Sequence, residues 1–282
     1  MNSRILLNMG LFIFLALTLL FFIDKKNDDK NIQRLSSLSL EKIETIHIPR
    51  KNNTGILFIK NNNNIWDMRK PYKIKAHQFR IKTLLKLTQT PVEKKLNTET
   101  LNLTDYALDP PRARIIFNTT EIAFGKNNPV NSKRYLLAEN KMLMLLDQAY
   151  PLVSAQAASF VDLSLVPDNF ELLKIQTPVA DIKLRNDKTW ESTGSIFLNT
   201  DQIQTLIQNW KSAQAFAVHK YMPRNNLGEL KISSKTKTLI FKITDDDPWL
   251  ILALPDIGIE YHLDKPLKNT LSGISPKDTP DA

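Results

Sequence analysis

Residues Ile5 to Ile23 read ILLNMGLFIFLALTLLFFI, an apolar run without a charged side chain. As a helix rising about 1.5 Å per residue, the run would extend about 28 Å, close to the roughly 30 Å hydrocarbon core of a bilayer. Most of its residues are Leu, Ile or Phe, which favour insertion into lipid. The stretch therefore predicts a single transmembrane helix, and this helix would decide where the rest of the chain is placed.

The sequence on either side of this run predicts its orientation. It is followed by Asp24-Lys25-Lys26 without a small-x-small cleavage pattern, which favours an uncleaved signal-anchor over a removed signal peptide. Residues 1–4 are too few to form a domain, whereas the long remainder can cross a membrane largely regardless of its charge. We therefore expect residues 1–4 in the cytoplasm, residues 5–23 in the bacterial inner membrane and the folded remainder in the periplasm.

The composition is that of a globular protein with a basic surface. The chain has 282 residues, 42% of them hydrophobic, which is enough for one large domain or two of ordinary size. The formal net charge is +9, but the cations are dispersed, so we expect a solvated positive surface and no nucleic-acid partner. The lack of Cys excludes disulfides, thiolate metal sites and cysteine nucleophiles.

Two parts of the chain share one order of predicted elements. In each, short strands and an Asn- or Asp-rich turn lead to a Trp, Trp66 or Trp190, and then to a helix and further strands. Apolar residues at i, i+3 and i+4 from Ile81 and from Ile203 mark the two helices. The predicted fold class is α+β: a tandem repeat of a strand-rich unit with one amphipathic helix packed on a mainly antiparallel sheet, preceded by one transmembrane helix.

The domain boundaries follow from this pattern. We expect a polar linker at 24–40, the first repeat at 41–150, a connecting segment at 151–169 and the second repeat at 170–270. Residues 271–282 form a polar stretch with two prolines, which predicts a disordered tail.

The histidines do not form a recognisable metal motif. His47, His77, His219 and His262 have no partner at metal-ligand spacing. His47 and His262 fall inside predicted strands, and the other two flank the predicted helices. We expect structural or surface roles for all four, while a metal site assembled from distant histidines stays open.

Two other patterns resemble catalytic or metal motifs without their companions. Ser-x-x-Lys occurs at Ser39 and Ser234, but the Ser-Asp-Asn and Lys-Thr-Gly motifs of penicillin-binding enzymes are absent. Asp245-Asp246-Asp247 lacks the alternating ligands and the glycine of a calcium loop, so a solvated hairpin turn is expected. We predict no catalytic, cofactor-binding or metal-binding residue, and no cofactor.

The four Trp residues allow two interpretations, a sugar-binding role and a structural role in the core. Together with several Tyr residues they would suit a sugar-binding platform. Trp66 and Trp190 occupy matching positions in the two repeats, however, which favours a core or semi-core role. Trp210 falls on the apolar stripe of the second predicted helix and is expected in the core.

The pattern around residue 105 is the most distinctive in the chain. It comprises Asp105-Tyr106-Ala107-Leu108-Asp109-Pro110-Pro111, Arg112 to Phe117, Phe124-Gly125-Lys126 and Lys133 to Leu136, with Trp66 upstream and Ser159 to Asp162 downstream. Over about residues 40–200 the chain resembles a bacterial family known only as a domain of unknown function. The resemblance implies one N-terminal span and an extracytoplasmic α+β region, and some relatives are encoded near gliding-motility-type ABC transporter components. The family has no assigned catalytic residues, and its usual Gly is replaced here by Ala107, which puts a positive φ at that turn in question.

These observations favour a membrane-anchored periplasmic accessory or binding module of the cell envelope that is not an enzyme. Its expected partners are the lipid bilayer, through residues 5–23, and an envelope protein, with a transporter as one candidate. One alternative is an envelope polysaccharide- or lipid-binding module, which predicts a contiguous aromatic or basic groove. A wall-polymer hydrolase is the other, and it predicts His and carboxylate side chains within hydrogen-bond distance in one cleft.

Overall fold

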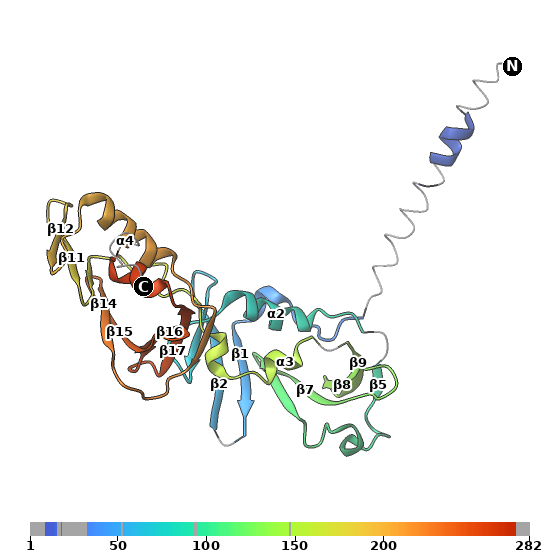
Figure 1. The fold of residues 1–282 in the computed structure, drawn as a ribbon. Coiled ribbons are helices and arrows are strands. Elements are labelled where there is room, and N and C mark those ends of the chain that lie inside the picture. The colour runs from blue at the N-terminus through green and yellow to red at the C-terminus, as the bar shows by residue number, and fades with distance from the viewer. Residues whose placement is uncertain are drawn as a thin grey trace. The chain divides into compact units, whose positions relative to one another are not determined.

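The structure is a computed structural model that describes residues 9–15, 18, 33–51, 53–92, 95–146 and 148–274. The described residues form mainly antiparallel strands, arranged in one sheet of nine strands and one of eight (Figure 1). By their contacts they fall into two compact units. One contains Leu85–Arg112, Thr120–Asp147 and the chain before Ile43, and the other contains Ile43–Leu84, Ala113–Thr119 and Gln148–Ala282.

The nine-stranded sheet has the order β4-β3-β2-β1-β6-β7-β8-β9-β5. Its strands are β1 (Thr45–Arg50), β2 (Asn53–Lys60), β3 (Trp66–Lys70), β4 (Ile74–Lys75), β5 (Lys95–Asn97), β6 (Ala113–Phe117), β7 (Thr120–Asn127), β8 (Arg134–Ala138) and β9 (Lys141–Leu145). The helical elements in this part of the sequence are η2 (Leu40–Lys42), α2 (Gln78–Thr88), η3 (Leu103–Tyr106), α3 (Tyr150–Val153) and η4 (Ala157–Phe160). Alternate residues of β1, Ile46 and Ile48, are buried, as expected for a strand with one face on a core.

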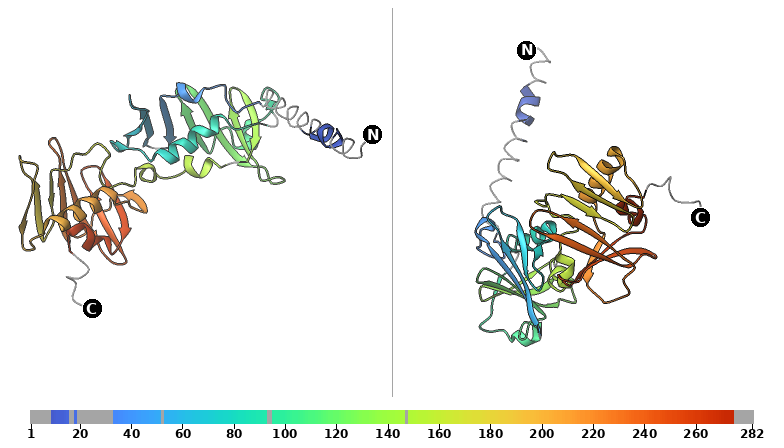
Figure 2. Two further views of the ribbon diagram at one scale, coloured as in Figure 1. Left: turned by 90° about the horizontal axis from the view of Figure 1, so that it is seen from above. Right: turned by 90° about the vertical axis from the view of Figure 1, so that its left-hand side faces the viewer.

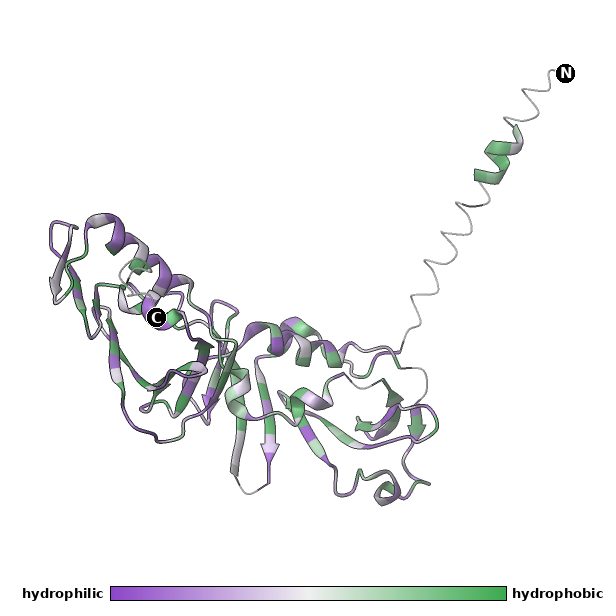
Figure 3. Ribbon diagram, in the orientation of Figure 1, coloured by the Kyte–Doolittle hydropathy of each residue, from purple (hydrophilic) through white to green (hydrophobic). Residues whose placement is uncertain are grey.

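The eight-stranded sheet has the order β12-β11-β10-β14-β15-β16-β17-β13. Its strands are β10 (Lys174–Gln176), β11 (Ala180–Leu184), β12 (Trp190–Gly194), β13 (Ala217–Lys220), β14 (Gly228–Ser233), β15 (Thr238–Asp245), β16 (Trp249–Leu254) and β17 (Ile259–Asp264). Two helices accompany them, α4 (Thr200–Ser212) and α5 (Leu267–Ser272). Hydrophobic and hydrophilic residues are interspersed along the strands (Figure 3).

The two sheets share one strand order apart from β4. The series β3-β2-β1-β6-β7-β8-β9-β5 corresponds strand by strand to β12-β11-β10-β14-β15-β16-β17-β13. In both sheets, the strand that follows the long helix pairs with the strand that comes last in the sequence. These pairs are β5 with β9 and β13 with β17. This connection places residues 217–220 beside residues 259–264.

Helix α4 covers one face of the eight-stranded sheet (Figure 2). It starts with a capping box, in which the Asn199 side chain accepts a hydrogen bond from the Gln202 amide and the Gln202 side chain accepts one from Asn199. The apolar stripe of α4 is buried, and the Trp210 ring lies 5.6 Å from the Phe241 ring of β15. Trp210 Nε1 donates to the Leu271 carbonyl of α5, so the buried ring leaves no unpaired donor.

The predicted α+β class is wrong. Most of the described chain is antiparallel sheet, and among the elements described only α2 and α4 exceed two turns. The apolar periodicity at Ile81 and Ile203 does belong to these two helices, and both residues are buried. The other α-helices after the two sheets, α3 and α5, are short. Helices therefore make up too small a share of the described residues for the α+β class.

The predicted transmembrane helix at 5–23 is not found either. Met9–Leu15 is helical and largely hydrophobic (Figure 3), but no helix of the described residues is long and apolar enough to cross a membrane. Within the predicted span, 5–8, 16–17 and 19–23 lie outside the described residues, as do 1–4 and 24–32. The expected tail at 271–282 begins within α5, and its last eight residues, 275–282, are also outside the described part.

The distinctive sequence pattern around residue 105 assembles into one packed corner. Leu108 forms a buried cluster with Ala123 and Met142, Tyr106 packs against this cluster, and the centroids of the Tyr106 and Tyr135 rings lie 4.8 Å apart. The Arg112 amide donates to the Phe124 carbonyl. Three separated parts of the pattern therefore serve one structural purpose, which is to seat the loop before β6 on strands β7 and β8.

Ala107 adopts the left-handed conformation that Gly would favour there, with φ 53° and ψ 41°. Because Cβ makes this conformation unfavourable and Gly adopts it freely, Ala107→Gly is expected to stabilise the fold by about 0.5–1 kcal/mol. Chemical denaturation of the full-length protein measures the change. As the control, Ala113→Gly in strand β6 should destabilise the protein by about 0.5–1 kcal/mol. Equal effects of the two substitutions on the free energy of unfolding would contradict the left-handed conformation of Ala107.

Candidate functional site

The eight-stranded sheet has one face turned away from α4, which we call the open face. The Tyr261 ring of β17 lies 6.3 Å from Phe241, on the side that α4 covers. Because successive strand residues point to opposite faces, Glu260 and His262 lie on the open face. Cross-strand partners share a face, so His219 of β13, which pairs with Glu260, lies there too.

Residues 221–227, the crossover segment, cross this open face. They connect β13 at the sheet edge to β14, and so pass β17, β16 and β15 in the strand order. The Met222 amide contacts Glu260 on β17, and the Leu227 amide donates to the Ile243 carbonyl on β15. The carboxylate of Glu260 is fully buried beneath the segment although it lies on the open face.

Glu260 is the charged centre of the site, and its two oxygens accept four hydrogen bonds. Oε2 accepts from the Met222 amide and from Arg224 Nη1, both at 3.1 Å. Oε1 accepts from Arg224 Nη2 at 3.2 Å and contacts His262 Nε2 at 3.1 Å. Because a carboxylate only accepts, His262 Nε2 carries the proton in this contact. Burial raises the pKa of Glu260, but the bonds from Met222, His262 and Arg224 outweigh it and hold the pKa below its ordinary value.

The second histidine stacks on the first. The ring centroids of His219 and His262 lie 4.5 Å apart, with 57° between the ring planes. Burial and the neighbouring His262 lower the pKa of His219, while Glu260 raises it by less. His219 is exposed, and its side chain makes no hydrogen bond to any residue that the structure describes.

Four rings continue across the open face, and we call them the aromatic row: Trp249, Phe216, His262 and His219. Phe216 lies 5.1 Å from Trp249 and 6.3 Å from His262, measured between ring centroids, and both contacts are T-shaped. Phe216 is 51% exposed and Trp249 is 47% exposed. The row is therefore contiguous, with Trp249, Phe216 and His219 exposed and His262 half-buried, and its polar end is the histidine pair.

The sequence did not predict this assembly. His219 was expected to flank a helix but lies in β13, and His262 lies in a strand as expected. The other two histidines do not belong to the site. His47 lies in β1, and His77 lies just before α2, where its amide donates to the Phe160 carbonyl. The pairing depends on the strand order of the whole sheet, which places β13 beside β17.

Several other expectations are confirmed at the level of single residues. Trp210 and Trp66 are buried, at 0% and 5% exposure. Asp245-Asp246-Asp247 ends β15 in a hairpin turn, where Lys268 and Lys265 pair with the second and third carboxylates. Ser234 also lies in a hairpin turn, and its hydroxyl donates to the Lys237 carbonyl.

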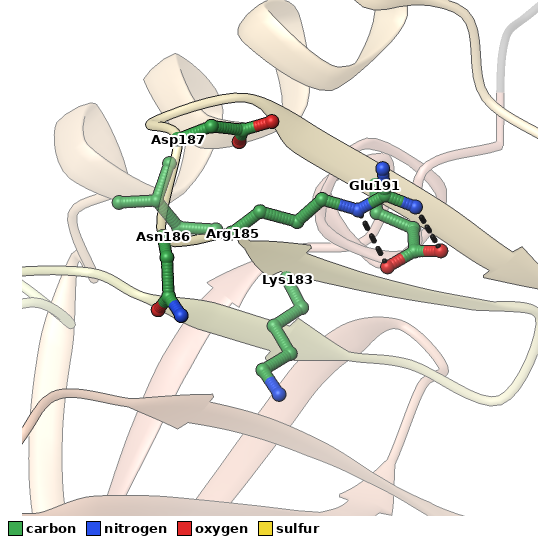
Figure 4. Close-up of a pocket in the computed structure, with 6 residues that line it drawn as sticks. Lys183, Arg185, Asn186, Asp187 and Glu191 are labelled. Carbon is green, nitrogen blue, oxygen red and sulfur yellow. Dashed lines mark hydrogen bonds and ion pairs between the residues drawn. The ribbon is translucent and has the colours of Figure 1, made fainter.

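A second polar surface lies at the hairpin between β11 and β12 (Figure 4). Arg185 donates to both carboxylate oxygens of Glu191, at 2.6 and 3.0 Å, and Asp187 accepts from the amide and hydroxyl of Thr189. The charges of Arg185, Asp187 and Glu191 are paired within the hairpin itself, so they stabilise a turn.

A third polar surface surrounds Glu139, in the turn between β8 and β9. Its Oε1 accepts from the Ser37 amide and from the hydroxyls of Ser36 and Ser37. Those bonds, the Ser37 amide first, hold the pKa of Glu139 below its ordinary value. The arrangement fixes the chain segment at 36–37 to this turn.

No group of three or more His, Asp or Glu side chains suited to hold a metal ion occurs among the described residues. With its fully bonded carboxylate and its exposed rings, the open face has the features of a binding surface. Comparison with known families gives the broader class: a model for a domain of unknown function, DUF4340, matches residues 66–248. The match covers more than half of the chain, and the protein belongs to this family. No curated protein and no solved structure matches the chain.

Proposed function

We propose that this protein is a non-enzymatic accessory module of the bacterial cell envelope that binds a partner protein through the aromatic row. The observation that carries the proposal is the exposure of Phe216 and Trp249 side by side on the open face. Large exposed aromatic side chains in contact are typical of protein interaction sites, where Trp and Tyr often contribute most of the affinity.

The ring geometry favours a protein over a polysaccharide as the ligand. A sugar ring stacks on a flat aromatic face, and a sugar chain needs a series of such faces in one plane. In the aromatic row the neighbouring ring planes are inclined by 67°, 80° and 57°. Such a corrugated surface suits side chains that insert between rings.

The chemistry of Glu260 weighs against the hydrolase alternative. That alternative predicted a His and a carboxylate within hydrogen-bond distance, and His262 and Glu260 have this spacing. However, a general acid or base must exchange a proton with a substrate, and the pKa should lie near the working pH. Glu260 is buried, accepts four hydrogen bonds and has a lowered pKa, so it is suited to hold Arg224 and His262 in position.

The apolar segment at 5–23 supports a place at the bacterial inner membrane, with the sheets in the periplasm. The resemblance of the residue-105 pattern to proteins encoded near transporter components makes a transporter subunit one candidate partner. A periplasmic protein at the inner membrane would meet integral membrane proteins, and the aromatic row would bind their exposed soluble loops.

Affinity capture of the full-length protein from solubilised membranes tests the proposal. The wild-type chain is expected to recover an envelope protein identified by mass spectrometry. Trp249→Ala should reduce its recovery by at least about tenfold, because hot-spot aromatic residues contribute about 2 kcal/mol or more. Phe197→Ala is the matched control, since Phe197 is also exposed but lies before α4 and outside the aromatic row. Equal recovery by the two variants would contradict the proposal.

A further inference from the structure

The histidine end of the aromatic row lacks an available counter-charge. Glu260 is the carboxylate in contact with His262, but its four hydrogen bonds already include two from Arg224. The negative charge of Glu260 is therefore matched by the guanidinium before either histidine gains a proton. A positive charge on His219 would have to be balanced by a group from outside this cluster.

The neighbouring elements do not supply that group. On the open face, β17 contributes Glu260, His262 and the exposed Asp264, which pairs across the sheet with Trp249 and is absent from the groups that shift His219. On the same face β15 contributes Lys242 and Asp245, and β14 contributes Glu229, whose carboxylate pairs with Lys231. From Gln214 to Gly228 the sequence contains no Asp or Glu. Of these carboxylates only that of Glu260, which is already occupied, shifts the pKa of His219.

We propose that the partner protein presents an Asp or Glu carboxylate to the His219–His262 pair, next to apolar side chains that insert between Phe216 and Trp249. This inference rests on the proposed function and specifies the chemistry of the partner. The exposed, unbonded ring of His219 offers the donor, and the aromatic row offers the apolar contacts.

Binding of this kind is linked to protonation. In the free protein, burial and His262 keep the pKa of His219 below its ordinary value, so the ring is neutral near pH 7. A carboxylate at hydrogen-bond distance favours the imidazolium form and raises the pKa in the complex. A proton is therefore taken up on binding, and the affinity should rise as the pH falls, by up to about tenfold per pH unit in the interval between the two pKa values.

Carbodiimide coupling locates the carboxylate directly. The reagent joins an amine to a carboxylate only when the two are in contact, so His219→Lys would place a reactive amine at the site. In solubilised membranes at pH 6.5 we expect a covalent adduct between position 219 and an Asp or Glu peptide of the captured protein. Gln208→Lys is the control, because Gln208 is exposed on α4 and therefore on the opposite face of the sheet.

The pH dependence of capture gives a second readout that needs no variant at the site. Recovery by the wild-type chain should be at least about threefold greater at pH 6 than at pH 8, and His219→Gln should abolish this difference. If a partner is captured through Trp249 but shows neither coupling at position 219 nor pH dependence, this inference is wrong and the proposed function stands. An adduct with an acidic polysaccharide or lipid overturns the inference, and failure to capture any protein overturns both.

Discussion

Replacing Arg224 with methionine is expected to lower the free energy of unfolding by about 3–5 kcal/mol. The substitution keeps most of the side-chain volume but removes the two hydrogen bonds that Arg224 donates to Glu260. Glu260 is fully buried, and removal of one partner of a buried ion pair leaves an uncompensated charge. The crossover segment would keep the Met222 contact with Glu260 but lose both Arg224 contacts that also hold it against β17. Chemical denaturation of the full-length protein at pH 7 measures the loss.

The pH dependence of this variant separates loss of charge pairing from loss of packing. In the wild type the lowered pKa of Glu260 contributes stability that is present above the unfolded-state pKa, about 4.3, and is lost as the pH falls through the folded-state value. In Arg224→Met the bonds and the charge of Arg224 no longer lower the pKa of Glu260, so the pKa should rise relative to the wild type and protonation in acid should recover part of the loss. Lys231→Met, which breaks the partly exposed pair with Glu229, should cost at most about 1 kcal/mol. A variant that is equally destabilised at every pH would contradict this account of Glu260.

Gly125→Ala should destabilise the protein by about 3 kcal/mol. A Cβ atom at this position in β7 would lie 2.3 Å from the Tyr106 carbonyl oxygen and 3.0 Å from the Leu108 side chain. The first contact is with backbone, which cannot move aside by rotating a side chain, so the loop around η3 would have to shift away from the sheet. Overpacking of a closely packed site costs about 1–3 kcal/mol, and a backbone clash belongs at the upper end.

A neighbouring position provides the control for this effect. Lys126→Ala changes the next residue of β7, whose side chain is exposed, and should alter the free energy of unfolding by less than about 0.5 kcal/mol. Fluorescence of Tyr106 and Tyr135, or hydrogen exchange of the Leu108 amide, should report the displaced loop in Gly125→Ala. Full retention of stability in that variant would show that the loop does not press on β7 as described.

Local features of this fold were readable from the sequence because they depend on neighbouring residues. The buried stripe of α4 that ends at Trp210 and the turn at Asp245-Asp246-Asp247 both follow from spacing within a few residues. The fold class was wrong because periodicity identifies a helix without giving its share of the structure. Antiparallel strands dominate the described residues, and no spanning helix occurs among them.

The binding surface could not be predicted because it depends on pairing between distant segments. His219 and His262 lie in contact because β13 pairs with β17. Strand β13 does not pair with β14, the strand that follows it in the sequence. Glu260 sits in a strand where alternation alone would predict an ordinary solvent-facing residue. Its burial depends on the path of the crossover segment, and that path is set by the strand order of the whole sheet.

The central claim is that the aromatic row binds a protein in the cell envelope. Its most direct test is an aromatic photo-crosslinking amino acid, which keeps a ring at the position, placed in living cells at Trp249, and at Gln208 on the opposite face as the reference position. The account predicts that irradiation yields one discrete adduct with an envelope protein from position 249 and none with that protein from position 208. The same adduct from both positions, or none from position 249 in a folded and normally abundant protein, would contradict it.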